Sequence, residues 1–200
     1  MAQGLDANNN LTDYGGHLKE DGYMWVGRYI NPGKSQPLTN AEAQTLTADG
    51  LYIVSIWEQG SPTQVGYFTT GAGTNAGNGA VSAAQSIGQP TGTPIYFAVD
   101  YDASSSDLPS IGGYFSALHS IVRAAGYFVG VYGSGLVCQF LSEQGTVSKT
   151  WLSQSTDFAG YQEWKPNADI IQGAETTVLG LDVDLDASAG DAGGWQIAAA

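Results

Sequence analysis

The sequence is poor in positive charge, in cysteine and in long apolar runs, and each shortage excludes a class of function. Only six lysine and arginine residues stand against nineteen aspartate and glutamate residues in 200, for a net charge of −13. An anionic duplex or membrane surface would be repelled, so we predict no nucleic-acid partner. Cys138 is the sole cysteine, which excludes an internal disulfide. No run approaches the roughly 18 apolar residues of a membrane span, so none is predicted.

Groups suited to metals or cofactors are also scarce. His17 and His119 fall within helical patterns and lack acid or cysteine partners at metal-ligand spacing. The acidic run near the C-terminus is not an EF-hand loop, because Ala187 and Gly193 stand where that loop needs glycine and glutamate. The glycines of 71–77 lack the spacing of a dinucleotide-binding turn. We therefore predict neither a metal nor a cofactor.

Charged residues make up only 12% of the chain, whereas hydrophobic residues reach 42%. The hydrophobic content is ample for one folded domain, and the scarcity of charge leaves a surface of small neutral polar side chains. Such a surface is suited to contact with carbohydrate or to a location in a crowded cell wall. Residues 1–6 carry neither the basic nor the apolar region of a signal peptide, so we expect none in this chain.

What the sequence does contain is a repeated alternation of short apolar strands and helical patterns. This alternation predicts a parallel sheet that helices cover on both faces, and eight strands favour a closed barrel. The expected strands are 3–6, 24–30, 51–57, 94–100, 127–132, 149–154, 168–172 and 179–185.

The predicted fold class is therefore α/β, with one compact (β/α)8 TIM-type barrel domain over residues 1–200. Its core is expected at about 3–187, followed by a C-terminal tail at 188–200. In so short a chain some helices must be short or missing, especially after strands six and seven. Residues 59–79 are expected to form a polar loop before a helix at 78–88. An open, doubly wound sheet is the alternative.

The predicted strand at 94–100 is apolar except at its end, where two acidic residues follow closely. The stretch reads Tyr96-Phe97-Ala98-Val99-Asp100-Tyr101-Asp102. Side chains two positions apart on a strand share a face, so we expect Asp100 and Asp102 to lie on one face at the strand's end. Two carboxylates are unfavourable there if buried, unless they are paired or perform chemistry. A solvated loop acid or a helix cap is the alternative for Asp102.

The ends of the other strands add mostly acids and hydrogen-bonding side chains, and strand ends form the active-site rim of such a barrel. The candidates are Asp6, Arg28, Trp57, Glu58, Asp100, Asp102, Tyr132, Gln154, Gln172, Asp182, Asp184 and Asp186. Glycosidic hydrolysis needs an acid that protonates the leaving oxygen, a carboxylate that stabilises or attacks the sugar, and aromatic rings that stack on it. Arg28 would hold nearby carboxylates ionised, or it is a structural counter-charge.

Six short motifs then carry a family resemblance over roughly residues 3–187. They are Gly4-Leu5-Asp6, Trp25-Val26-Gly27-Arg28-Tyr29, Pro94-Ile95-Tyr96-Phe97-Ala98-Val99-Asp100, Gly130-Val131-Tyr132-Gly133-Ser134, Trp151-Leu152-Ser153-Gln154 and Leu181-Asp182-Val183-Asp184. In this order and spacing, the chain resembles the bacterial glycoside-hydrolase-like domain of unknown function. That family is related to the family 25 lysozymes (muramidases) and is typified by a secreted mycobacterial protein.

The resemblance implies a barrel whose site is lined by acids from strand one, strand four and the last strand. Carried over, these fall on Asp6, on Asp100 with Asp102, and on Asp184. The lysozymes have a glutamate as proton donor where this chain has Asp102, which is one methylene shorter. This departure puts lysozyme activity in doubt and leaves Glu58 as the other candidate acid. The resemblance also implies a secreted or cell-wall-associated protein.

Two functions follow from these interpretations. The first is hydrolysis of a cell-wall polysaccharide such as peptidoglycan, with Asp100 as base or nucleophile and either Asp102 or Glu58 as acid. In that scheme Asp6 and Asp184 orient substrate or water. The residues expected to bind substrate are Arg28, Trp57, Tyr132, Gln154, Gln172 and Asp182. The second function is a catalytically silent, carbohydrate-binding or cell-wall-associated barrel, which the aspartate at position 102 favours. We expect a monomer.

Overall fold

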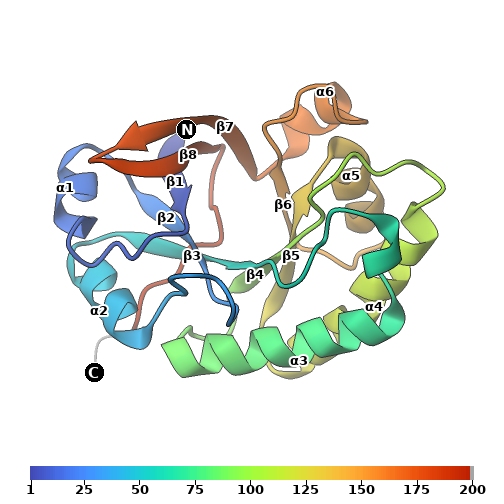
Figure 1. The fold of residues 1–200 in the computed structure, drawn as a ribbon, viewed down its shortest axis with the longest axis horizontal. Helices are drawn as coiled ribbons and strands as arrows, with labels where there is room; N and C mark the ends of the chain where they lie inside the picture. The colour runs from blue at the N-terminus through green and yellow to red at the C-terminus, as the bar shows by residue number, and fades with distance from the viewer. Residues whose placement is uncertain (199–200) are drawn as a thin grey trace.

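A computed structural model describes residues 1–198 as a closed barrel of eight strands with helices around it (Figure 1). The strands follow one another around the barrel in chain order. They are β1 (Ala2–Ala7), β2 (Trp25–Tyr29), β3 (Tyr52–Trp57), β4 (Pro94–Ala98), β5 (Phe128–Gly133), β6 (Lys149–Leu152), β7 (Ile170–Val178) and β8 (Leu181–Ser188). The predicted α/β barrel is confirmed, and the open sheet is excluded.

Helices connect most of the strands. They are α1 (Gly15–Glu20), α2 (Asn40–Ala48), α3 (Thr70–Ile87), α4 (Leu108–Ala124), α5 (Gly135–Glu143) and α6 (Tyr161–Trp164), with 3-10 turns η1 (Val65–Tyr67) and η2 (Lys165–Asn167). Only the single turn of α6 and η2 lie between β6 and β7, and β7 leads directly into β8, so the expected shortage of helices is confirmed. Within residues 1–198, each helix is too short or too polar to cross a bilayer.

The last strand runs in the opposite direction to the prediction. The pairs from β1–β2 to β6–β7 are parallel, but β8 is antiparallel to both β7 and β1. Leu179 and Gly180, both with positive φ, turn the chain between β7 and β8, and a two-residue turn joins only antiparallel strands. In Figure 1 the two strands form a ribbon at the upper left. The first half of β8 therefore reaches the rim, where Asp184 pairs with Asp6.

Helix α3 begins earlier than predicted. Thr69 caps it by accepting a hydrogen bond from Ala72 N at 3.1 Å, and residues 70–77 are helical rather than a loop. The glycines of this segment allow α3 to pack closely on α4. A Cβ at Gly73 would collide with the backbone of Tyr114. In Figure 1 the two helices cover the lower side of the barrel. The glycines that indicated a loop thus serve helix packing.

The strand side chains divide between two cores, because adjacent residues of a strand point to opposite faces. An outer core lies between the barrel and the helices and includes Leu5, Val26, Ile53, Trp57, Phe97, Val129 and Val183. A smaller inner core lies along the barrel axis and consists of Trp25, Val54, Ile56, Tyr96, Trp151, Ile170 and Ala192. Whether a residue at the rim faces a helix or the barrel interior therefore depends on its position in this alternation.

The segment after β8 packs onto the amino-terminal end of the barrel. Trp195 exchanges two backbone hydrogen bonds with Ile53, both of 2.8 Å, and its indole donates to Ser55 Oγ at 2.9 Å. The hydroxyl of Tyr96 donates to the carbonyl of Ala192 at 2.8 Å. Trp195 is only 2% exposed. The core therefore extends beyond residue 187, where the sequence had suggested that a tail begins.

Candidate active site

A pocket of about 290 Å³ opens at the carboxyl ends of the parallel strands, and we call it the rim pocket. Its lining residues are Asp6, Tyr29, Ile56, Glu58, Ala98, Asp100, Tyr132, Trp151, Gln154, Gln172 and Asp184. The predicted site residues that the structure brings together here are Asp6, Glu58, Asp100, Tyr132, Gln154, Gln172 and Asp184. Ligand pockets at the carboxyl ends of barrel strands are the rule for this architecture.

Asp6 occupies the end of β1 and is 4% exposed. Gln172 Nε2 donates to Asp6 Oδ2 at 3.1 Å. The oxygen of the same amide accepts the Tyr132 hydroxyl at 2.8 Å and the Gln154 backbone N–H at 3.3 Å. These bonds fix which end of the Gln172 amide faces Asp6. One hydrogen-bonded chain thus ties β1 to β5, β7 and the segment after β6, and it holds the Asp6 carboxyl in place.

Burial and neighbouring charge favour the protonated form of several groups here. Burial raises the pKa of Asp6 from 3.8 to about 7, and the nearby Asp184 carboxylate adds to that rise. Burial also raises the pKa of Asp184, and the charge of Glu175 acts in the same direction. Burial and the surrounding carboxylates raise the pKa of the Tyr29 and Tyr132 phenols, which stay protonated as hydrogen-bond donors.

Glu58 and Asp100 flank the pocket after β3 and β4. Lys34 Nζ lies 2.7 Å from Glu58 Oε2, so this carboxylate is the partner of a cation. The Asn31 side chain accepts from the Glu58 backbone N–H at 3.2 Å and fixes the chain there. Asp100 is exposed, and its backbone N–H donates to the carbonyl of Pro62 at 2.9 Å. The pocket therefore holds one carboxylate with a lysine partner and one that is open to solvent.

Asp102 does not join Asp100, contrary to the prediction. Strand β4 ends at Ala98, so the alternation of side chains stops before either acid. Asp102 is exposed, and its Oδ1 accepts the backbone N–H of Ala159 at 2.8 Å. It is absent from the lining of the rim pocket. Its exposed position fits the solvated loop acid that the sequence analysis gave as one alternative.

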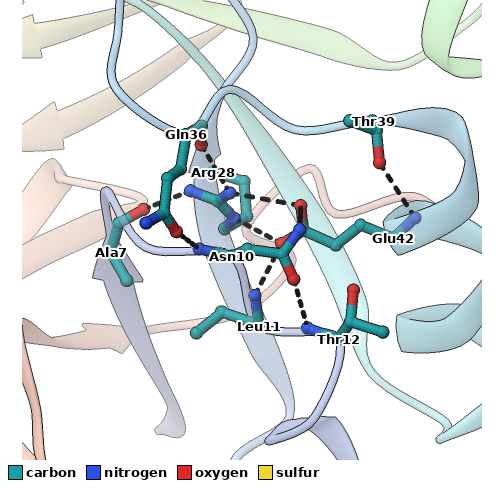
Figure 2. A network of polar contacts seen from close by, with 8 residues as sticks. All are labelled: Ala7, Asn10, Leu11, Thr12, Arg28, Gln36, Thr39 and Glu42. Atoms are coloured by element: carbon teal, nitrogen blue, oxygen red, sulfur yellow. Dashed lines mark hydrogen bonds and ion pairs between the residues drawn. The ribbon is translucent and has the colours of Figure 1, made fainter.

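Arg28 also lies away from the rim pocket. Its side chain is fully buried beside α2, where Nε lies 2.8 Å from Glu42 Oε1 (Figure 2). The guanidinium also donates to the carbonyl oxygens of Ala7 at 2.6 Å and Gln36 at 2.8 Å. Its strand neighbours Gly27 and Tyr29 face the barrel interior, so Arg28 points out. The prediction that Arg28 binds substrate is therefore wrong. The structure supports the alternative, in which Arg28 is a structural counter-charge, here to Glu42.

Two other predicted contacts differ from expectation. Trp57 is 1% exposed in the outer core, with its ring against Gly79 of α3, so it is not placed to stack on a ligand in the rim pocket. Asp182 is exposed on β8, where it lines a smaller adjoining pocket of about 130 Å³. This second pocket shares Asp6, Tyr29 and Asp184 with the rim pocket, so the two pockets adjoin at those residues.

Sequence reasoning left two residues of this region out of the predicted site. Tyr29 and Trp151 line the rim pocket. Asp186 is 5% exposed, and the Trp151 indole donates to its Oδ1 at 3.0 Å. The signal for Tyr29 was present in the sequence, because it lies two and four residues beyond Gly27 and Trp25 on β2. Asp186 was among the candidates, but its position follows from the antiparallel register of β8 against β1, which the sequence did not predict.

Two further observations concern groups that bind metals and the one thiol. Within residues 1–198, no three histidine, cysteine or acidic side chains gather in a way that could hold a metal ion. Cys138 is buried in α5, and burial raises the pKa of its thiol. A thiol in that environment is not activated as a nucleophile.

Residues 16–188 match the sequence pattern of the Rv2525c-like, glycoside hydrolase-like domain family. The chain belongs to this family. The uncharacterized protein FadG of Bacillus subtilis (strain 168) is 33% identical over 159 residues, which cover 74% of this chain and 27% of that protein. The chain thus spans about a quarter of the length of the curated relatives that it matches.

Solved structures show the same fold in this glycoside hydrolase-like family and in lysozymes. The Tat-secreted protein Rv2525c of Mycobacterium tuberculosis has a TM-score of 0.82 at 24% identity, with 97% of this chain and 98% of that chain covered. The bacterial lysozyme of Streptomyces coelicolor has a TM-score of 0.61 at 12% identity, with 96% and 93% covered. The resemblance inferred from the motifs is therefore confirmed.

The raised pKa of Asp6 predicts how the stability of this domain depends on pH. Between pH 3.8 and about 7 the folded state holds a proton on Asp6 that the unfolded chain has lost. The free energy of unfolding should fall as the pH rises through this window, by up to about 1.4 kcal/mol per pH unit for one group. Urea unfolding at pH 5 and pH 8 measures the difference, and Asp6→Asn should reduce it. An equal difference in the variant would contradict the prediction.

Proposed function

We propose that this domain hydrolyses a glycosidic bond in a cell-wall polysaccharide such as peptidoglycan. The observation that carries the proposal is the set of carboxylates on one pocket, Asp6, Glu58, Asp100 and Asp184, together with the rings of Tyr29, Tyr132 and Trp151. Glycosidases of both stereochemical types use two such carboxyl groups, and aromatic faces bind sugars. The family's glycoside hydrolase-like description and the shared fold with a lysozyme support the same reaction.

In this proposal the acid and the base come from different strands. Asp100, exposed at the pocket, attacks the sugar carbon or takes a proton from the attacking water. Asp6 donates a proton to the leaving oxygen, since its pKa of about 7 keeps a proton available near neutral pH. Glu58 is less suited to that role because Lys34 holds it as an ion pair. Asp184 borders both hollows and orients substrate or water.

Binding of the polysaccharide is assigned to the neutral groups of the pocket. Tyr132, Gln154 and Gln172 offer amide and hydroxyl groups to sugar hydroxyls. Tyr29 and Trp151 offer ring faces, a role that the sequence analysis had given to Trp57. No cofactor is needed for this acid–base reaction. We further propose a monomer that is secreted or associated with the cell wall, by likeness to the Tat-secreted protein Rv2525c.

The second candidate function is a carbohydrate-binding barrel without catalysis. The observation that favours it is Asp102, which stands in place of a lysozyme glutamate and bonds to Ala159 N outside the rim pocket. In this alternative the pocket binds a glycan but lacks a competent proton donor. The two functions differ in turnover and not in binding.

Release of reducing ends from purified peptidoglycan, chitin and other wall glycans tests the proposal. We expect the wild-type domain to release reducing ends from at least one glycan, and Asp100→Asn to reduce the rate by about 10²-fold or more. Asp21→Asn is the matched control, since it removes one exposed carboxylate on the C-cap of α1, outside the rim pocket. Glycan binding by affinity electrophoresis without any release would instead establish the silent barrel. Equal rates for Asp100→Asn and wild type would refute the assigned role of Asp100.

A further inference from the structure

Asp100 reaches the rim pocket from a loop and not from a strand. Strand β4 ends at Ala98, and the loop of residues 99–107 leads from there to α4. The Val99 N–H still donates to the carbonyl of Tyr132 at 2.8 Å, and Asp100 follows, exposed, in the lining of the pocket. Beyond a strand the alternation of side chains no longer sets their direction, so the placement of this carboxylate depends on the contacts that hold the loop.

Two hydrogen bonds attach this loop to other segments of the rim. The Asp100 N–H donates to the carbonyl of Pro62 at 2.9 Å, on the segment after β3. Two residues further on, Asp102 Oδ1 accepts the N–H of Ala159 at 2.8 Å, on the segment after β6. The loop is therefore attached on two sides, and the side chain of Asp102 provides the attachment toward β6.

The Ala159 end of the second attachment is itself fixed. Its carbonyl accepts the N–H of Leu136 at 2.8 Å, in the first turn of α5. The next residue, Gly160, has a positive φ of 74° and lies so close to α5 that a Cβ at Gly135 would collide with its carbonyl. A side chain at either glycine would push the two segments apart. Asp102 thus bonds to a peptide that is held against a helix, so this bond can restrain the loop that carries Asp102.

We propose that Asp102 is a positioning residue, whose bond to Ala159 restrains the loop after β4 and so keeps Asp100 in place at the rim pocket. A carboxylate that accepts a backbone N–H makes a charge-assisted bond, which is stronger than one between neutral groups. The effect on catalysis rests on the proposed function, in which Asp100 is the base or nucleophile, whereas the restraint on the loop does not. Asp102 contacts neither the substrate nor the reacting atoms, and it contributes to the reaction only through Asp100.

Backbone hydrogen exchange measured by NMR tests the restraint without any substrate. Asp102→Ala removes the acceptor, so exchange of the Ala159 and Asp100 amides should become faster by about tenfold or more. Asp102→Asn keeps an acceptor oxygen and should leave both rates within about threefold of the wild type. The amide of Trp195, which donates to Ile53 at the opposite end of the barrel, reports on global opening, and its rate should change less than either.

The pattern of the exchange rates decides the inference. Faster exchange of both rim amides than of Trp195 in Asp102→Ala supports it. Acceleration of Ala159 alone, with Asp100 as in the wild type, overturns it, because the bond would then restrain only its own donor. Equal acceleration of all three amides also overturns it, since the substitution would then act through global stability.

Steady-state kinetics test the consequence for catalysis. On any glycan that the wild type hydrolyses, Asp102→Ala should lower kcat by about tenfold or more, because a misplaced catalytic group slows the chemical step. The KM should stay within about twofold, since the groups assigned to binding are unchanged. Asp102→Asn should restore kcat to within about twofold of the wild type. Asp157→Ala is the control, because it removes an exposed carboxylate from the segment of Ala159, outside the rim pocket, and both constants should be unchanged.

The two readouts separate this inference from the proposed function. Faster exchange at Asp100 in Asp102→Ala, together with a wild type that hydrolyses no glycan, overturns the function and leaves the restraint on the loop. Wild-type kcat in Asp102→Ala despite that faster exchange overturns the positioning role in catalysis. A loss of kcat that Asp102→Asn does not restore overturns it as well, because the carboxylic acid itself would then be required.

Discussion

Replacing Asp6 by asparagine (Asp6→Asn) is expected to lower kcat for glycan hydrolysis by a factor of about 10²–10⁴, the usual contribution of a positioned proton donor. Asparagine keeps the size of the side chain and can still accept from Gln172, but it has no acidic proton. The KM should change little, because the neutral binding groups of the pocket remain. Steady-state kinetics on the glycan that the wild type cleaves measures both constants.

The matched variant is Asp102→Asn, which decides between this acid and the one that the lysozyme pattern implies. Asparagine at position 102 can still accept the Ala159 N–H through its side-chain oxygen, so the loop contact survives. Since Asp102 does not line the rim pocket, we expect kcat to stay within about twofold of the wild type. A loss of about 10²-fold in Asp102→Asn with an active Asp6→Asn would reverse the assignment.

Much of the fold and of the pocket could be predicted because strand ends are easy to recognise. Eight apolar runs separated by helical patterns indicated the closed barrel, and the acids that follow those runs gave Asp6, Glu58 and Asp100. The direction of β8 was not predicted, because Leu179-Gly180 is not one of the usual two-residue hairpin sequences, although both residues have positive φ in the structure. That direction decides which end of the acidic run reaches the rim.

The incorrect site predictions have one physical cause in common. A residue at a strand end points into the barrel only if an even number of positions separates it from an inner-core residue of the same strand. Arg28 and Trp57 are each an odd number of positions away from such a residue, so they point outward. Applying the alternation from Trp25 gives Tyr29, and applying it from Ile56 gives Glu58. Asp102 keeps the right parity but lies beyond the end of β4, where parity no longer fixes direction. Sequence spacing thus predicts the direction of a side chain within a strand and directly after it, as at Glu58, but not as far along the loop as Asp102.

Removing the charge of Arg28 is expected to produce a large loss of stability in this domain. The pair Arg28–Glu42 has both side chains at 0% exposure, and Arg28→Met leaves Glu42 as a buried, uncompensated carboxylate. The free energy of unfolding should fall by about 3–5 kcal/mol. For a chain of this size, that lowers Tm by roughly 6–20 °C. Chemical and thermal unfolding measure the two quantities.

Glu42 explains why the loss is so large. Besides Arg28, it accepts hydrogen bonds from the Leu11 backbone N–H at 2.9 Å and the Asn10 side chain at 3.2 Å, and its own N–H donates to Thr39 at 3.2 Å (Figure 2). One carboxylate thus joins the segment after β1 to β2 and α2. Arg28→Met forces that carboxylate either to remain charged without its cation or to take up a proton, and both weaken the network.

A second substitution separates the charge from the packing. The double variant Arg28→Met/Glu42→Leu removes both charges, so its loss should be smaller than the sum of the single losses, with coupling of about 1–3 kcal/mol. Lys149→Met is the control, because the pair Lys149–Asp169 is partly exposed and should contribute only about 0–1 kcal/mol. Comparable losses in Lys149→Met and Arg28→Met would contradict the role of burial.

The same variants test the placement of Arg28 outside the rim pocket. Its guanidinium bonds to Glu42, Ala7 and Gln36, none of which faces the rim pocket through its side chain. At a temperature where Arg28→Met is folded, its KM for the glycan should therefore match that of the wild type within about twofold. A rise in KM without loss of folded protein would instead make Arg28 a substrate contact, since only a group that binds substrate changes KM alone. Stability and binding are in this way assigned to opposite faces of the same strand.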